Sequence, residues 1–345
     1  ESEVYAQLLF LRRKGYPMWR NSRLPGVHKQ EGVQIGDVGI LNDSGGFEYF
    51  FNVCHPADHP LNTGRVPGGF KPLLGINPDD IIDNAREYEP GSHVASNPHH
   101  ILKRKIQVDT LEKTLNNYSH LRLRNVPEEV DAGLSFSSSA TQGALLILPE
   151  GGQKVDHQQH SKFYNYTTEF ARSWYRHINR PLAREIRNGS LYLVTGYDKA
   201  RAWGVACFDD EDVCIIFMDI VPKVSSAVER APKYWFSRCD GASSLSDADD
   251  VFENESGAVF LRGFKIAIRE SWFLPKYSEV TYTSNMNVDS LLSEAYSAAS
   301  WYPKLWKWLR LLFPETSNGP RDESNITVTS IPSKHQVSSE KTSDR

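Results

Sequence analysis

The chain has 345 residues, of which 39% are hydrophobic and 24% are charged. This length and composition allow one large domain, or two of ordinary size, with a sizeable core. A formal net charge of −4 predicts no general attraction to nucleic acid or anionic lipid, and no apolar run reaches the length of a membrane span.

The four cysteines form neither a CxxC pair nor a dense framework. Sparse cysteines in a chain of this length are typical of a reducing compartment. The N-terminal residues show no secretory signal, so we expect a cytoplasmic protein. The short turn between Cys207 and Cys214 leaves one disulfide open as an alternative.

Residues 1–125 predict a short helix, a β-hairpin and a long loop region. The apolar run at 4–14 favours the helix. Strand-like runs at 33–41 and 47–53 flank the sequence NDSGG, which is a strong hairpin signal. Residues 55–100 contain seven prolines, which predicts a loop region that is either functional or partly disordered.

Residues 130–314 predict most of the remaining regular structure. The alternating sequence at 133–148 is interpreted as a β-hairpin. Residues 156–179 give the clearest helix, because apolar side chains recur at spacings of three and four and Pro181 follows its end.

Residues 188–220 predict three short strands joined by tight polar turns. The first run is apolar on both faces and is interrupted at Gly196, and apolar residues return at period two from 203 to 207. A third run, rich in β-branched residues, follows at 213–218. Successive strands with short turns favour an antiparallel meander. Further strands are predicted at 234–238, 258–268 and 280–284.

The predicted fold is therefore α+β, mainly an antiparallel sheet with one long amphipathic helix and a C-terminal helical segment at 288–313. Residues 315–345 lack aromatic side chains and predict a disordered tail. The organisation is either an N-terminal region at 1–125 followed by an α+β region at 130–314, or one domain over 1–314.

Charged and aromatic residues gather at the predicted turn after Gly196. Asp198, Lys199, Arg201 and Trp203 lie on or beside this turn, and Asp37 lies within the strand candidate at 33–41. Loops on a rigid sheet commonly carry function, so these five residues are the candidate ligand or partner surface. The competing interpretation is a solvated hairpin tip with the tryptophan in the core.

Residues that could bind metal occur in the sequence CHPADHP at 54–60. Its spacing fits no known zinc pattern, and a loop with surface histidines is the favoured interpretation. The acidic run at 209–212 lacks the glycine and distant glutamate of a calcium loop. No metal site is therefore predicted.

Motifs of catalysis are absent from the sequence. There is no G-x-S-x-G nucleophile motif, no phosphate-binding loop and no dinucleotide fingerprint. No catalytic residue and no cofactor is therefore predicted.

Trp301, Trp306 and Trp308 lie within eight residues, with lysines and an arginine interleaved. Such a helix suits either a membrane interface or docking on the domain with its lysines directed outward. Docking is favoured. The Ser/Thr alternation at 133–148 would also suit a pore-forming hairpin, although ordinary edge hairpins are far commoner.

Several short motifs resemble an uncharacterised protein family of mushroom-forming fungi. They are YAQ at 5–7, GYPMW at 15–19, GV at 32–33, IGDVG at 35–39, FNVC at 51–54, ADHP at 57–60, GALLILP at 143–149, NGSLYLVTG at 188–196, DK at 198–199 and WG at 203–204. The resemblance covers roughly residues 4–270 and implies a fungal, intracellular origin. It implies no activity, and the chain departs from the family pattern from residue 288 onward.

These observations favour a non-enzymatic intracellular binding or interaction protein, such as a sensing or signalling module. Protein or small-molecule partners are expected, and nucleic acid is not. One alternative is an enzyme with an unrecognised site built around Asp37, Asp198, Lys199 and the histidine-rich loops. Another is a peripheral membrane protein that uses the tryptophan-rich helix.

Overall fold

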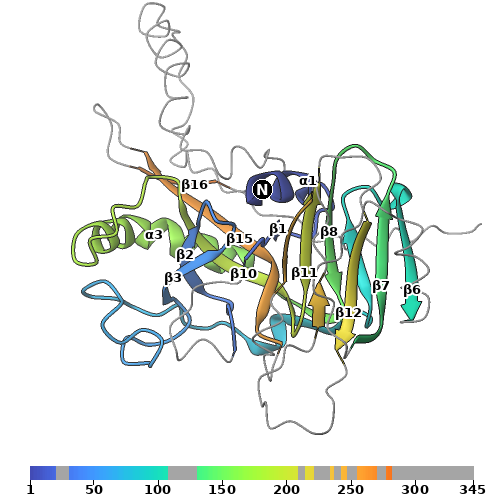
Figure 1. The fold of residues 1–345 in the computed structure, drawn as a ribbon. Helices are drawn as coiled ribbons and strands as arrows, with labels where there is room; N and C mark the ends of the chain where they lie inside the picture. The colour runs from blue at the N-terminus through green and yellow to red at the C-terminus, as the bar shows by residue number, and fades with distance from the viewer. Residues whose placement is uncertain are drawn as a thin grey trace, which may run out of the picture.

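The computed structural model describes residues 1–20, 31–107, 130–208, 214–220, 234–236, 242–246, 255–269 and 277–281. Within these residues the fold is α+β, with two α-helices and three antiparallel sheets (Figure 1). The helices are α1 (Ser2–Phe10) and α3 (His160–Asn179). Two short 3-10 helices, η2 (Pro78–Asp80) and η3 (Pro98–His100), precede strands.

The central sheet is built around two long paired strands, β10 (Leu191–Ala200) and β15 (Gly257–Arg269). The far edge of β15 pairs with β1 and β16, and that of β10 pairs with β2 and β9. Strand β3 extends the sheet beyond β2, and β4 extends it beyond β9. The bounds of these six strands are β1 (Tyr16–Pro17), β2 (Asp37–Leu41), β3 (Phe47–Asn52), β4 (Ile81–Tyr88), β9 (Gly152–His157) and β16 (Tyr277–Thr281).

Two four-stranded sheets lie together on one side of the central sheet (Figure 1). The inner sheet has the order β14-β11-β8-β5, and the outer sheet has the order β13-β12-β7-β6. A ring contact between His93 and Phe136, with centroids 5.2 Å apart, joins the two sheets. The inner strands are β5 (Ser92–Ala95), β8 (Gly143–Leu148), β11 (Gly204–Phe208) and β14 (Ala242–Ser246). The outer strands are β6 (Ile101–Gln107), β7 (Val130–Ser138), β12 (Cys214–Ile220) and β13 (Tyr234–Phe236).

Strand β8 shows how the layers bury apolar sequence. All six of its residues are buried, as expected for a strand that is covered on both faces. Tyr5 and Leu9 of α1 pack on its Leu146 and Leu148 in one core cluster. The edge strand β6, in contrast, exposes Lys103 and its two basic neighbours, and such charges discourage pairing with other chains.

Helix α3 covers the opposite side of the central sheet. Its Phe163, Trp174 and Ile178 are buried against Leu193 and Phe264 of β10 and β15, which confirms the predicted apolar spacing. The helix begins at His160 rather than 156, because residues 152–157 form β9.

The proline-rich segment after β3 packs on α3. The Phe70 ring lies 6.0 Å from that of Phe51, and the Tyr166 hydroxyl donates to the Lys71 carbonyl at 2.5 Å. The region predicted as loop at 55–100 also contains β4 and β5. Its seven prolines lie before β4, between β4 and β5, or in the 3-10 helices, and none lies within either strand. The frequent prolines therefore hid two strands from the sequence-based prediction.

Two predicted strand pairings are wrong. Strands β10, β11 and β12 are present, but they belong to the central, inner and outer sheets respectively and form no meander. Likewise β7 and β8 are not a hairpin, since they lie in different sheets. Short polar connections here cross from one sheet to the next, and apolar alternation does not distinguish a crossing from a hairpin turn.

Other predictions agree with the structure or fall outside its described part. The hairpin at 33–53 is confirmed as β2 and β3, and the first helix ends at Phe10 rather than 14. The C-terminal helical segment and the tail lie outside the described residues. Strands from 1–125 and from 130–314 share all three sheets. No α-helix in the described ranges is both long and apolar enough to cross a membrane.

The pairing of β8 with β11 can be tested by a disulfide. Ala144 lies directly opposite Cys207, and paired Cα atoms at about 4.5–5.5 Å suit a disulfide. We expect the Ala144→Cys variant, refolded under oxidising conditions, to lose two reactive thiols relative to its reduced form. The Ala144→Cys/Cys207→Ser variant should lose none. A disulfide between Cys207 and Cys214 instead would contradict the assignment of β11 and β12 to different sheets.

Candidate functional site

The candidate site lies where β10 exchanges one neighbouring strand for another. Leu191–Leu193 pair with β2, whereas Gly196–Lys199 pair with β9. A register shift between Val194 and Gly196 marks the exchange, and the pairing with β15 continues beyond it. A β-bulge of this kind re-aims the side chains that follow it.

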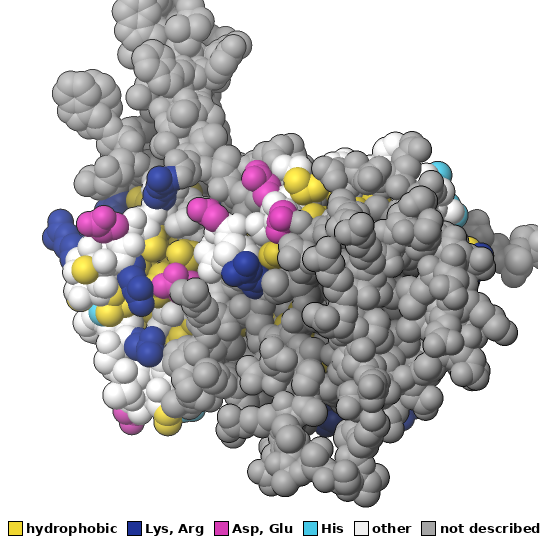
Figure 2. Space-filling view, in the orientation of Figure 1, with side chains coloured by type: hydrophobic (Ala, Val, Ile, Leu, Met, Phe, Trp, Pro, Cys, Tyr) yellow, Lys and Arg dark blue, Asp and Glu magenta, His cyan; other side chains and the backbone are white. Residues whose placement is uncertain are grey.

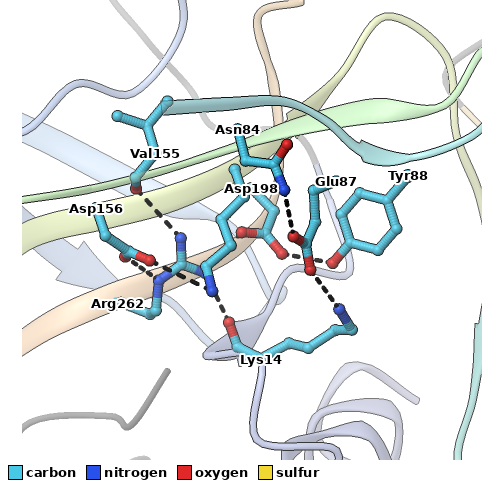
Figure 3. A network of polar contacts seen from close by, with 9 residues as sticks. Lys14, Asn84, Glu87, Tyr88, Val155, Asp156, Asp198 and Arg262 are labelled. Carbon is cyan, nitrogen blue, oxygen red and sulfur yellow. Dashed lines mark hydrogen bonds and ion pairs between the residues drawn. The ribbon is translucent and has the colours of Figure 1, made fainter. Parts of the chain in front are cut away.

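Arg262 of β15 lies at the centre of this site (Figure 3). Its side chain is 3% exposed and forms ion pairs with Asp156 of β9 and, at 2.7 Å, with Asp198 of β10. It also donates to the Lys14 carbonyl at 2.7 Å and to the Val155 carbonyl at 3.2 Å. All three guanidinium nitrogens therefore have partners from this chain.

Gly196 explains how the arginine reaches across the sheet. It pairs with Arg262 on one side and with Asp156 on the other. A Cβ atom at position 196 would lie 2.0 Å from the Asp156 carboxylate and 3.1 Å from the Arg262 Nε atom. Only the missing side chain leaves room for the ion pair to span three strands.

The network continues outward through Asp198. Its second carboxylate oxygen accepts a hydrogen bond from the hydroxyl of Tyr88 in β4. The Lys14 ammonium lies 4.6 Å from the centre of the Tyr88 ring and pairs with Glu87 at 3.1 Å. The network thus joins β4, β9, β10, β15 and the segment after α1, as Figure 3 shows.

Burial and charge act in opposite directions on the pKa values of Asp198 and Arg262. Burial raises the pKa of Asp198, and Arg262 and the Tyr88 hydroxyl offset part of that rise. Burial alone would lower the pKa of Arg262, but Asp198 and Asp156 raise it above its ordinary value. Burial and the adjacent Asp198 raise the pKa of Tyr88, so its hydroxyl stays protonated and donates.

Lys199 belongs to a separate polar cluster. It is 3% exposed, donates to the Glu31 carbonyl at 2.6 Å and lies 4.0 Å from the centre of the Tyr197 ring. Burial lowers its pKa to about 8, against the opposite influence of nearby Asp37 and Glu31. Lys199 and Asp198 are neighbours in sequence, but they contact different partners.

Asp37 holds the backbone where β2 begins. Its carboxylate accepts hydrogen bonds of 2.7 Å from the Gln34 amide and from the Asn52 side chain. Asn62 then bonds both to the Asn52 backbone and to the His55 carbonyl. Asp37 is fully buried, so it anchors the loop that follows β3.

The histidine-rich loop is linked to Asp37 through Asn52 and Asn62. The His55 and His59 rings stack with centroids 4.0 Å apart. Burial raises the pKa of the neighbouring Cys54 thiol to about 12, which makes it unreactive at neutral pH. Within the described residues no group of three or more His, Cys, Asp or Glu side chains could hold a metal ion.

The predicted ligand surface is largely buried. Asp37, Asp198, Lys199 and Trp203 are at most 3% exposed, and only Arg201 is exposed. Trp203 packs against Gly257, where a Cβ atom would lie 1.9 Å from its ring. The core position weighed for this tryptophan is therefore confirmed. Trp301, Trp306 and Trp308 lie outside the described residues.

Sequence reasoning missed Arg262, Asp156 and Tyr88. One signal was present, since Arg262 and Lys265 interrupt the apolar sequence of the strand predicted at 258–268. A charge in a strand that is otherwise apolar indicates a buried partner of opposite sign. The identity of that partner depends on strand order, which the sequence did not reveal.

No protein-family model matches this sequence, and no curated protein matches it either.

The buried amine of Lys199 predicts a specific pH dependence. Its pKa is about 8 in the folded state and about 10.4 in an unfolded chain. Between these values the unfolded state binds more protons, so the contribution of Lys199 to stability rises with pH. The free energy of unfolding of Lys199→Met minus that of wild type should therefore fall as the pH rises above 8. The fall should be at most about 1.4 kcal/mol per pH unit.

Urea unfolding of both proteins at several pH values between 7 and 9.5 gives the measurement. The difference between variant and wild type is the proper readout, because the raised pKa of Cys54 acts in the opposite sense. If the difference for Lys199→Met does not change with pH, the pKa of about 8 for Lys199 in the folded state is contradicted.

Proposed function

We propose that this chain is a non-enzymatic binding protein whose buried charges serve its own structure. The observation that carries the proposal is that four of the five N–H donors of Arg262 bond to groups of the same chain. Its Nε, Nη1 and Nη2 atoms donate to two carboxylates and two backbone carbonyls of the same chain. An arginine engaged in this way has little capacity left for a substrate.

The residues of the enzyme hypothesis do not form one constellation. Asp198 faces Arg262 and Tyr88, whereas Lys199 faces Tyr197 and the Glu31 carbonyl. The Asp37 carboxylate accepts hydrogen bonds from the Gln34 amide and the Asn52 side chain. Catalysis requires a nucleophile or base and its partners to converge on a reacting atom, and these contacts favour a structural role.

One observation supports an enzyme as the second candidate. The pKa of Lys199 lies at about 8, within the range of lysines that act as bases or nucleophiles. Perturbed pKa values gather at functional sites, but buried structural groups show them too. Lys265 illustrates this, because burial alone also lowers its pKa to about 8.

We also propose an intracellular location. Cys54 is a free cysteine, and its raised pKa keeps it in the thiol form, which suits a reducing compartment. The alternative is attachment to a membrane through Trp301, Trp306 and Trp308.

Thermal unfolding against a panel of metals, nucleotides and metabolites tests the proposal. A ligand at about 100 times its dissociation constant adds about 2.7 kcal/mol of stability, which moves the midpoint by several degrees. We expect a cooperative transition and no shift above about 1 °C with any compound. A clear shift that disappears in Lys199→Met would overturn the proposal and indicate a small-molecule site at that lysine.

A further inference from the structure

A dense group of arginines lies outside the buried network. The arginine surface consists of Arg172, Arg176, Arg180, Arg184 and Arg187, on the C-terminal half of α3 and the loop after it. No lysine occurs between residues 172 and 187. Figure 2 shows several separate basic side chains, with acidic and apolar ones among them, in the region where Figure 1 places α3.

This surface is positive in a chain that is negative overall. Four of its arginines are exposed and Arg172 is half-buried. Only Glu169 and Glu185 supply negative charge within residues 169–187. Arg184 also pairs with Glu48 at 3.4 Å, yet its side chain remains 58% exposed. The net charge of the whole chain is −4, so this concentration of positive charge is local.

The backbone beneath the surface is fixed by hydrogen bonds. The Asn179 side chain donates to the Ile186 carbonyl at 3.0 Å and accepts from its amide at 2.6 Å. The Arg184 amide bonds to the Ile178 carbonyl at 3.1 Å. These contacts fold the loop back onto the end of α3 and hold it there.

Arg184 stands between two residues of unusual conformation. Ala183 and Glu185 both have φ of 49°, in the left-handed region that non-glycine residues seldom occupy. Such strain persists only when the surrounding structure enforces it, and it often marks functional positions. A rigid support lowers the entropy that a bound partner must overcome.

Stabilisation of the helix dipole does not account for the whole surface. Basic side chains in the last turn of a helix interact favourably with its C-terminus, which suits Arg176. Arg184 and Arg187 lie beyond the end of the helix, where this effect has faded. The helix dipole therefore does not explain their place on this surface.

The chemistry and spacing of the arginines favour an acidic peptide. Guanidinium groups bind carboxylates and phosphates through paired hydrogen bonds. Residues four apart on a helix are separated by about 6 Å along its axis, and alternate residues of an extended chain by about 6.6 Å. Arg172, Arg176 and Arg180 therefore match acidic side chains at every second position of an extended segment.

We propose that the arginine surface binds an extended acidic segment of a partner protein. This inference rests on the proposed binding function and names the surface and the chemistry of the partner. The net negative charge of the chain opposes non-specific attachment to nucleic acid or anionic membranes.

Fluorescence anisotropy with a labelled Glu-Ser repeat peptide of about twelve residues tests the inference. We expect the full chain to bind this peptide, and to bind it more weakly as salt rises. The Arg176→Gln/Arg180→Gln/Arg184→Gln variant should bind about tenfold more weakly or not at all. The matched control is Lys103→Gln/Arg104→Gln/Lys105→Gln, which removes the exposed basic run of β6 and should change affinity less than about twofold.

Three results would overturn the inference. They are no binding by the wild-type chain, an equal loss in both triple variants, or tighter binding of a single-stranded RNA or a phosphatidylserine vesicle that the arginine variant abolishes. Circular dichroism spectra of both triple variants serve as the control for folding. If the chain does not bind the peptide and no compound of the ligand panel shifts its unfolding midpoint, the arginine surface is rejected as a binding site. The proposal that the chain is not an enzyme would still stand.

Discussion

The ion pairs of Arg262 are the interaction on which the central sheet depends. A guanidinium that is removed from water loses several kcal/mol of hydration energy, and only close carboxylates and further hydrogen bonds recover that loss. Asp156, Asp198 and two backbone carbonyls do so here. These groups lie on β9, on β10 and in the segment after α1. The charge of Arg262 can therefore be buried only when these elements are in place.

The position of this network matters as much as its strength. At Gly196 the neighbour of β10 changes from β2 to β9, and the backbone ladder is interrupted there. Strand β2 belongs to the part of the sheet beneath α3, whereas the later residues of β10 lead through Trp203 into the inner sheet. Arg262 lies beside this junction, and it ties β9 and the segment after α1 to β10 and β15 there.

Local features of the fold could be predicted from the sequence, because each is encoded within a short window. The spacing of Phe163, Trp174 and Ile178 is enough to identify α3, and the NDSGG turn is enough to identify the hairpin at 33–53. The pairing of distant strands is not encoded in this way. The connections after β10 and β11 look like hairpin turns, but they lead from one sheet to the next.

The same limit applies to the candidate site. Asp198 and Lys199 stood out because they are charged residues on or beside a predicted turn, but their partners are 64 and 168 residues away in the chain. Their burial follows from the layers that cover β10, which periodicity alone does not reveal. The arginine surface was overlooked for a related reason. Its residues belong to a helix and a loop, and Asn179 folds that loop back onto the helix.

The most direct test of the central claim is the cost of a methyl group at Gly196, measured as the free energy of unfolding in urea. We predict that Gly196→Ala destabilises the chain by about 3–5 kcal/mol, because it separates Arg262 from Asp156. The cost should fall by more than about 1 kcal/mol when the same change is made in an Asp156→Ala background, because coupled positions are not additive. Gly68→Ala, where a Cβ atom meets nothing within 4 Å, should change stability by less than about 0.5 kcal/mol. An equal cost of Gly196→Ala in both backgrounds would contradict the account, since the ion pair would then not be what the glycine protects.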